Sequence, residues 1–335
     1  MQSRPKHKSV EGIDASAIPE SLLQSTQPLL LSGFVKQWPS VQKAQDSDHA
    51  IADYLRGFYR GEPLTVYEGD PSIKGRIFYN DDFTGFNFAR TRQDLNTVLD
   101  KLLTNVNSNP APTYYVGSTM VDHWLPGFRQ ANDIALGTDE SLVSIWIGNR
   151  SRIAAHYDFP HNIACVVAGR RRFTLFPPNQ IENLYVGPLD FTPSGQAISL
   201  VDSTNPDLQR YPKYKEAMQN AIVFDVQAGD AVFIPSMWWH HVESLEPFNV
   251  LVNYWWRTTP AYLGAPANAL LNSLLSMRDL PQDQKQIWKA LFDYYVFGDQ
   301  ENKFEHIPEQ ARGVLSSLDF DKAQAIKAQL QKFLK

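Results

Sequence analysis

Short hydrophobic runs follow one another through the middle of the chain, and turn-forming residues separate them. The runs are Leu142–Ile147, Ile153–Tyr157, Ile163–Ala168, Arg172–Phe176, Ile222–Val226, Ala231–Ile234, His241–Leu245 and Val250–Trp256. Glycine, proline, asparagine and aspartate stand between them, as in Gly148-Asn149 and Pro177-Pro178-Asn179. Many short strands with such turns are typical of an antiparallel sandwich or barrel of the jelly-roll group. The pattern therefore predicts a jelly-roll core.

The regions on either side of this core carry a different pattern. Before it, Leu29–Val35 and Thr113–Val116 are strand-like, whereas Asp46–Tyr59 and Thr91–Leu103 have helical periodicity. From about Pro266, apolar residues recur in three helical stripes, which are Leu270, Leu271, Leu274 and Leu275, then Ile287, Leu291, Tyr294 and Tyr295, and, after a start at Asp321, Ile326, Leu330, Phe333 and Leu334. We predict a mainly β protein with α elements, organised as an N-terminal α/β elaboration (1–110), the jelly-roll core (111–260) and a C-terminal helical region (261–335).

A long insertion divides the core. Residues 180–220 are polar and contain several prolines, and the stretch is too long for a tight turn. Long insertions of this kind in compact domains often form lids or binding loops. We expect this one to shape the choice of substrate.

Composition narrows the class of protein. Against 31 lysines and arginines the chain has 36 aspartates and glutamates, a net charge of −5, which offers no general attraction to nucleic acid or anionic lipid. No apolar run approaches the ~20 residues that span a bilayer. The single cysteine, Cys165, excludes an intramolecular disulfide, and its apolar neighbours predict burial. Because no apolar stretch directly follows the basic Met1–Lys8, we predict no signal peptide and a cytoplasmic location.

A pair of potential metal ligands stands on one predicted strand. His156 and Asp158 are one residue apart, so on a strand both side chains point to the same face. A histidine in the downstream segment Pro235–Val242 could complete a set of two histidines and one carboxylate. That set is the facial triad of non-haem Fe(II) oxygenases. From the residues alone, a surface histidine beside an unrelated aspartate explains the pair equally well.

Several stretches together resemble a known family. They are His156-Tyr157-Asp158, Gly169–Pro178, Gly229–Pro235, Trp238–Ser244 and Val252–Trp255. In this order and spacing they resemble the Jumonji C (JmjC), or cupin-like, 2-oxoglutarate oxygenases, and within them the group typified by the asparaginyl hydroxylase called factor inhibiting hypoxia-inducible factor. The resemblance implies a double-stranded β-helix core, Fe(II) and 2-oxoglutarate as cofactors, O2 as co-reactant, and a homodimer formed through the C-terminal helices.

The resemblance also implies roles for single residues. His156, Asp158 and His240 would hold the metal, with His240 chosen because the family's ligand directly follows an aromatic pair, while His241 would point to the other face of its strand. Arg171 stands where the closest group has a lysine that binds the far carboxylate of 2-oxoglutarate, and arginine offers that carboxylate a bidentate, permanently charged partner. Further polar contacts would come from Tyr115, Asn162 and Asn253, whereas Ile153 replaces a family threonine and lacks its hydroxyl.

Other residues near these stretches have two interpretations each. His161 could line the pocket, although the triad is complete without it. The tryptophans Trp238, Trp239, Trp255 and Trp256 fit core packing better than substrate contact. Trp124 lies in a loop-like segment and is the better candidate for the rim of a substrate site.

Four functions remain compatible with the sequence. The first is an Fe(II)- and 2-oxoglutarate-dependent dioxygenase that hydroxylates an unidentified substrate, either a protein side chain or a small molecule. The second is a demethylase of the same fold, although the chain lacks the zinc modules and basic surfaces of chromatin-directed relatives. The third is a non-enzymatic cupin-like sensor or regulator, and the fourth is a zinc-bound isomerase, which would need neither Arg171 nor Asn253.

Overall fold

The fold was obtained as a computed structural model, and it divides into two compact units, Met1–Arg257 and Thr258–Lys335. Residues 9–138, 140–193, 195–299, 301 and 303–334 are described. The basic segment Met1–Lys8, from which we predicted the absence of a signal peptide, lies outside the described residues. The unit boundary falls close to the predicted start of the helical region at residue 261, and the finer division at residue 110 stays a prediction.

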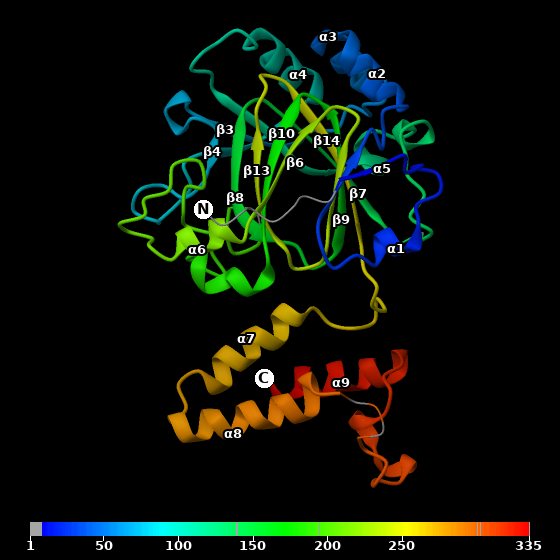
Figure 1. Cartoon of the computed structure of the whole chain (residues 1–335), viewed down its shortest axis with the longest axis vertical. Coiled ribbons are helices and arrows are strands. Elements are labelled where there is room, and N and C mark those ends of the chain that lie inside the picture. Colours follow the sequence, from blue (N-terminus) through cyan, green and yellow to red (C-terminus); the bar gives the residue numbers. More distant parts are fainter. Residues whose placement is uncertain (1–8, 139, 194, 300, 302, 335) are drawn as a thin grey trace. The chain divides into compact units, whose positions relative to one another are not determined.

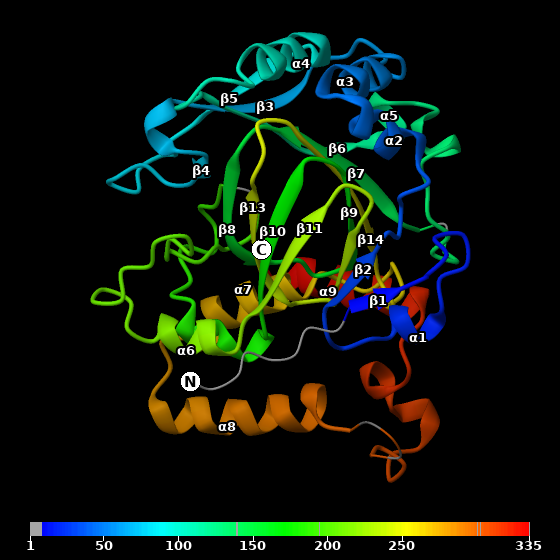
Figure 2. The same cartoon turned by 45° about the horizontal axis from the view of Figure 1, so that its top comes forward.

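Two β-sheets face each other in the first unit (Figures 1 and 2). The larger has nine strands in the order β1-β2-β12-β9-β14-β7-β6-β3-β5, and the smaller has five in the order β11-β10-β13-β8-β4. The strands are β1 (Ser9–Glu11), β2 (Leu29–Ser32), β3 (Leu64–Gly69), β4 (Arg76–Ile77), β5 (Ala89–Gln93), β6 (Thr113–Met120), β7 (Leu142–Gly148), β8 (Ser151–Tyr157), β9 (His161–Ala168), β10 (Arg170–Phe176), β11 (Ile222–Gln227), β12 (Ala231–Ile234), β13 (Trp239–Ser244) and β14 (Asn249–Trp256). This is the predicted jelly-roll core with added helices.

Apolar side chains fill both faces of the larger sheet. Between the sheets lies a core that includes Val166, Phe173 and Val232, from β9, β10 and β12. The outer face is covered by helices α2 (Pro39–Asp46), α3 (Asp48–Arg56) and α4 (Leu95–Thr104), whose buried residues belong to one cluster with those of β7, β9 and β14. Shorter helices are α1 (Glu20–Leu23), α5 (Val121–Trp124) and α6 (Tyr214–Gln219), with 3-10 turns at Pro71–Ile73, Phe128–Gln130 and Pro178–Asn183. The helices therefore cover the outer face of the larger sheet, and the space between the two sheets is where a site can form.

The predicted strands agree with the observed ones to within a few residues, whereas two predicted helices need correction. The predicted helix Asp46–Tyr59 is wrong in its first part, because Ser47 has an extended backbone, ends α2 and caps α3. The predicted helix Thr91–Leu103 is wrong in its first turn, because residues 91–93 belong to β5, which pairs with β3. The helix begins at Leu95, after Asp94 caps it by accepting from the backbone N–H of Asn96.

The second unit consists of helices, as the three apolar stripes predicted. They are α7 (Pro266–Met277), α8 (Gln282–Phe292), a π-helical turn (Asp293–Phe297), 3-10 turns (Glu309–Ala311 and Gly313–Leu315) and α9 (Phe320–Phe333). Asp319 rather than Asp321 caps the last helix, through the N–H of Lys322. Among the described residues, no helix combines the length and apolar character needed to cross a membrane.

Gly169 forms the tight turn that joins β9 to β10. Its φ is +74°, and a Cβ at this position would lie 2.4 Å from Asn249 Oδ1 and 2.5 Å from the carbonyl oxygen of Phe248. We expect Gly169→Ala to lower the free energy of unfolding by about 3 kcal/mol or more, because backbone strain and a clash with backbone act together. Urea unfolding would measure this loss.

Gly61→Ala is the matched control, because Gly61 also has a positive φ, +87°, with nothing within 4 Å of an added Cβ. It should lose about 1 kcal/mol, the cost of the left-handed backbone alone. Equal losses in the two variants would contradict the steric argument.

Candidate metal and cosubstrate site

The three predicted metal ligands come together on two neighbouring strands. β8 and β13 are antiparallel partners in the smaller sheet, and His156 lies directly opposite His240 in their register. Their ring centroids are 4.2 Å apart. Asp158 follows β8, and its Oδ2 lies 3.6 Å from His240 Nε2. One ligand atom from each of the three residues lies within 4.8 Å of the others.

Backbone contacts fix the orientation of both histidines. His156 Nδ1 is 2.9 Å from the carbonyl oxygen of Ala154, and His240 Nδ1 is 3.0 Å from that of Trp238. A carbonyl can only accept, so each Nδ1 carries a proton, which leaves Nε2 as the nitrogen that could bind a metal. Burial, and then the neighbouring His156, lower the pKa of His240 to about 4. His240 is therefore neutral at physiological pH, the state that binds metal.

This donor set fits a divalent transition metal with open coordination positions. Two neutral imidazoles and a carboxylate gathered on one side leave the other side open, which is the arrangement of non-haem Fe(II) sites. Because the two histidines come from paired strands and Asp158 directly follows one of them, the fold holds the three side chains in place before any metal binds. Among the described residues, no other group of histidines, cysteines and carboxylates has this geometry.

Trp255 on β14 holds the carboxylate ligand from the opposite sheet. Its Nε1 donates to Asp158 Oδ2 at 3.1 Å. We expect Trp255→Phe, which keeps an aromatic ring but removes the donor, to weaken Fe(II) binding about tenfold to a hundredfold, as loss of an outer hydrogen bond to a ligand typically does. Competition with a chelator of known affinity would measure it.

Trp256→Phe is the control for this prediction. Trp256 is buried and stacks on His161, on the side of β14 away from Asp158. The Trp256→Phe variant should bind Fe(II) with unchanged affinity. An equal loss of affinity in both variants would mean that Trp255 acts only through packing.

The ligands open into a cavity of about 160 Å³ between the two sheets. Its lining residues, drawn from both sheets, the N-terminal region and the insertion, are Tyr67, Ile77, Tyr115, Gly117, Ser118, Trp146, Ile153, Ala154, His156, Asp158, Asn162, Ala164, Arg171, Phe173, Pro193, Ile198, Ile234, His240, Val242, Leu251, Asn253 and Trp255. Most of these side chains are apolar or aromatic. The few polar groups therefore stand in a largely dry surrounding, where their interactions are strong.

Arg171 is the buried cation of this cavity. It is 2% exposed, whereas its neighbours Arg170 and Arg172 point outward and pair with Glu246 and Asp225. Strand alternation places the side chain of Arg171 on the opposite face from those of its two neighbours, and the structure agrees. Burial lowers its pKa to about 10, so it stays charged at neutral pH.

Arg171 has no carboxylate partner among the described residues, and its Nε makes no hydrogen bond there. An uncompensated buried charge is costly, by several kcal/mol, so the side chain fits an anionic ligand. In the register Leu175 lies opposite His240 and Arg171 opposite Ser244. The arginine thus starts four residues along β10 from the metal ligands, about 13 Å at the usual rise of a strand. A small diacid chelating the metal at one end would extend toward it.

The other predicted cosubstrate residues line the same cavity. Asn253 Oδ1 accepts from Trp146 Nε1 at 2.8 Å, and Asn253 Nδ2 donates to Asn162 Oδ1 at 3.4 Å. Tyr115 is buried next to Arg171, and burial raises the pKa of its hydroxyl, so it stays protonated. Ile153 also faces the cavity and presents no hydroxyl. The structure thus brings all seven predicted site residues to one cavity.

Two histidines that the sequence left open do not reach the cavity. His161 accepts from the backbone N–H of Ser236 at 3.3 Å and stacks on Phe233 and Trp256. His241 is buried but absent from the cavity lining, in line with its expected position on the other face of β13.

The expectation that Trp124 forms a substrate rim is wrong. It is partly buried against the core of the helix-covered face and does not line the cavity. Trp255 instead lines the cavity, although the sequence favoured core packing for this residue. One signal was available, because Trp255 is two residues from Asn253 and therefore on the same face of its strand.

A jelly-roll with two histidines and a carboxylate facing a cavity between its sheets has the architecture of a cupin and a donor set compatible with metal binding. The sequence profile of the family described as the cupin-like domain matches residues 15–262, which is most of the chain. The chain belongs to this family, in its JmjC-type branch, whose members are 2-oxoglutarate oxygenases or hydroxylases.

Parts of the chain are similar to curated proteins. It is 38% identical to the lysine-specific demethylase JMJ31 of Arabidopsis thaliana over 35% of this chain and 21% of that protein. It is 31% identical to human HSPB1-associated protein 1 over 39% of this chain and 27% of that protein. It is 37% identical to the tRNA wybutosine-synthesizing protein 5 of Gallus gallus over 32% of this chain and 30% of that protein. The matched part covers less than a third of each of these relatives.

Proposed function

We propose that this chain is an Fe(II)- and 2-oxoglutarate-dependent dioxygenase that hydroxylates a substrate C–H bond. The observation that carries the proposal is the pairing, in one cavity, of the His156–Asp158–His240 set with the buried, unpaired guanidinium of Arg171. A zinc-bound isomerase would need only the first of these. A buried cation aimed at the same space is explained by a chelating cosubstrate with a second carboxylate.

Each residue has a defined task under this proposal. The two Nε2 atoms and the Asp158 carboxylate would hold Fe(II), with Trp255 keeping that carboxylate in place. Arg171 would bind the far carboxylate of 2-oxoglutarate, and Tyr115, Asn162 and Asn253 would offer it polar contacts. Bound together, Fe(II) and 2-oxoglutarate supply the O2-dependent oxidation of a C–H bond, with 2-oxoglutarate converted to succinate and carbon dioxide.

The small cavity bears on the kind of substrate. Pockets that enclose a drug-sized ligand are typically about 300–1,000 Å³, and this one is about 160 Å³. With the cosubstrate inside, only a side chain or another small group of the substrate would enter. A protein side chain or the tip of a small molecule satisfies this limit, and the net charge of −5 disfavours nucleic acid.

A demethylase is the second candidate, because one relative carries that activity in its name. Both reactions would begin with the same oxidation of a C–H bond, but only oxidation at an N-methyl group releases formaldehyde. Formaldehyde release alongside succinate would identify the demethylase, and succinate alone the hydroxylase.

Anaerobic titration with Fe(II) and 2-oxoglutarate tests the proposal, by following the visible charge-transfer band of the metal chelate. We expect a band in the wild type and none in His240→Ala, which lacks one ligand. His49→Gln, an exposed replacement on α3, should behave as wild type. A wild-type protein that binds Fe(II) without forming the band would contradict the dioxygenase proposal, and the sensor and isomerase hypotheses would remain.

We further propose that the C-terminal unit forms a homodimer. Its helices carry large exposed apolar side chains, including Leu275 at 79%, Phe297 at 73% and Phe333 at 72%. Exposed apolar patches of this extent are typical of interaction surfaces. Removal of residues 266–335 should convert a dimer to a monomer in light scattering, and an unchanged oligomeric state would refute the proposal. A cytoplasmic location stays a prediction.

A further inference from the structure

β5 is the outermost strand of the larger sheet on its β3 side (Figure 2). It pairs with β3 through Leu64–Glu68, and no other described strand pairs with it. No hydrogen bond from the remaining described residues reaches the outward backbone groups of Ala89–Gln93. A strand with this free edge can accept another strand.

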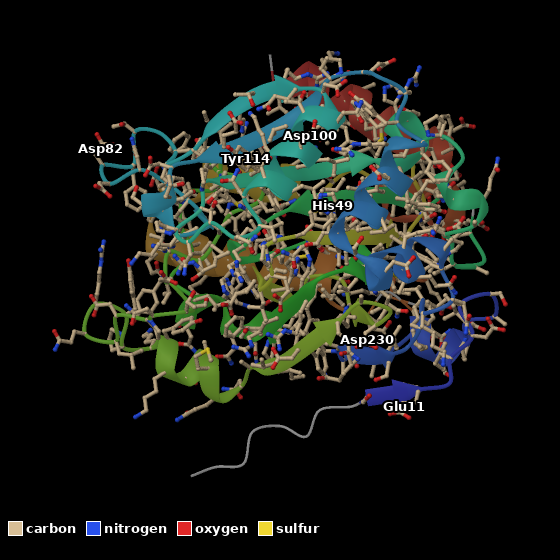
Figure 3. The ribbon with its side chains drawn as sticks, turned by 90° about the horizontal axis from the view of Figure 1, so that it is seen from above. Glu11, His49, Asp82, Asp100, Tyr114 and Asp230 are labelled. Carbon is tan, nitrogen blue, oxygen red and sulfur yellow. The ribbon has the colours of Figure 1, made fainter. Side chains whose placement is uncertain are left out.

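Two arginines stand on one face of this edge strand. Arg90 and Arg92 are two residues apart and both exposed, and among the described residues neither lies within ion-pair distance of a carboxylate. The acidic residues nearest in sequence are otherwise engaged. Asp94 caps α4, and Asp82, at the tip of the loop that precedes β5 (Figure 3), accepts from the N–H and hydroxyl of Thr84. The edge therefore presents two guanidinium groups that have no ion-pair partner among the described residues.

The same face of the sheet leads to the metal cavity. In the register, Arg90 lies opposite Tyr67 on β3, and Tyr67 lies opposite Tyr115 on β6. Both tyrosines line the cavity. Arg90 also lies over the ring of Tyr67, 5.3 Å from its centroid, and donates at 2.7 Å to the carbonyl of Pro193, another lining residue. The charged edge is thus continuous with the wall of the cavity.

We propose that the free edge of β5 docks an extended acidic peptide segment by strand addition, next to the cavity that would receive the reacting group. Main-chain hydrogen bonds to β5 would hold the segment, and Arg90 and Arg92 would select acidic side chains on its matching face. The occupant is a polypeptide with acidic side chains, because the edge of β5 offers backbone hydrogen-bonding groups and Arg90 and Arg92 have no carboxylate partner among the described residues. This inference names the substrate class of the proposed oxygenase and rests on that function, but the docking itself needs no metal.

Charged residues on an edge strand also keep sheets from pairing edge to edge. Under that explanation the arginines repel other edges and bind nothing. The two explanations differ in whether an acidic strand binds and in whether the binding needs its backbone N–H groups.

The experiment is a fluorescence anisotropy titration of the full-length chain with labelled twelve-residue peptides. The probe alternates threonine and glutamate, which places every glutamate on one face of a strand. The comparison peptides are a threonine–lysine copy and a fully N-methylated copy of the glutamate peptide, which keeps the charges but cannot donate backbone hydrogen bonds. The protein variants are Arg90→Glu/Arg92→Glu, Arg92→Glu alone, and Arg278→Glu as an exposed charge reversal in the second unit.

We expect saturable binding of the glutamate peptide alone, weakened about tenfold in the double variant, the combined effect of two exposed charge pairs turned into repulsion. Arg92→Glu, which breaks none of the contacts of Arg90, should lose about threefold, and Arg278→Glu should lose nothing. No saturable binding, equal binding of the N-methylated peptide, or full binding by both arginine variants would overturn the proposal. Failure of the metal titration described above would leave these results unaffected, so the two proposals fail separately.

Discussion

Replacing Arg171 with methionine is expected to weaken 2-oxoglutarate binding by roughly two to three orders of magnitude. Removing one partner of a buried, hydrogen-bonded charge pair costs about 3–5 kcal/mol, and every 1.4 kcal/mol is about tenfold in affinity. Fe(II) binding should stay unchanged, because Arg171 is on β10 and contacts none of the three ligands in the structure. The anaerobic charge-transfer titration at saturating Fe(II) would give the affinity.

The same variant should be at least as stable as the wild type without ligands. Methionine removes a buried charge that lacks a partner, and replacing such charges by apolar residues is often neutral or stabilising. Loss of affinity together with retained thermal stability would identify Arg171 as a ligand-binding rather than a structural residue.

Two further variants sharpen this test. Arg172→Met changes an exposed neighbour that pairs with Asp225, and it should leave 2-oxoglutarate affinity unchanged. Arg171→Lys keeps the charge but not the bidentate geometry, and it should retain part of the affinity. An Arg171→Met protein with wild-type affinity would show that the guanidinium does not bind the cosubstrate.

Stability of the metal-free protein is expected to fall steeply below neutral pH. Burial lowers the pKa of both His240 and His241 to about 4, from an ordinary value of 6.5. Between these values the unfolded chain binds protons that the folded chain does not, so the free energy of unfolding decreases as the pH falls. Two such histidines should cost about 3 kcal/mol between pH 7.5 and pH 5.5.

Urea unfolding in the presence of a chelator, repeated across this range, would measure the effect. His241→Gln should show about half the pH dependence of the wild type, whatever its stability at pH 7.5. His49→Gln, which replaces an exposed histidine on α3 (Figure 3), controls for the loss of a titratable residue. An unchanged slope in His241→Gln would mean that this buried imidazole does not resist protonation.

The core strands could be predicted from the sequence because their signals are local. Short apolar runs ended by Gly, Pro or Asn residues coincide with strands β7 to β14, and the His156–Asp158 spacing already placed both side chains on one face. The same alternation explains why Arg171 points to the opposite face from Arg170 and Arg172. These features depend only on a few neighbouring residues.

Features set by distant pairing could not be predicted in this way. β5 is exposed along most of its length, so no hydrophobic alternation marks it, and its pairing with β3 decides its conformation. Likewise, the hydrogen bond from Trp255 to Asp158 joins β14 of one sheet to the residue that follows β8 of the other. Tyr67 and Ile77 enter the cavity from a region whose sequence pattern indicated only a mixed elaboration.

The position of β13 between β10 and β8 has a consequence for the biosynthesis of the protein. A nascent chain that has emerged only as far as β12 contains His156 and Asp158 but lacks both His240 and the strand that connects β8 to β10. Such a chain offers only two of the three ligands, at the end of β8, which then has β4 as its one partner strand among the described strands, and two ligands are too few for a tight metal site. Iron loading would therefore follow, rather than guide, translation of the first unit, and the iron content of a preparation would report how much of it has completed the smaller sheet.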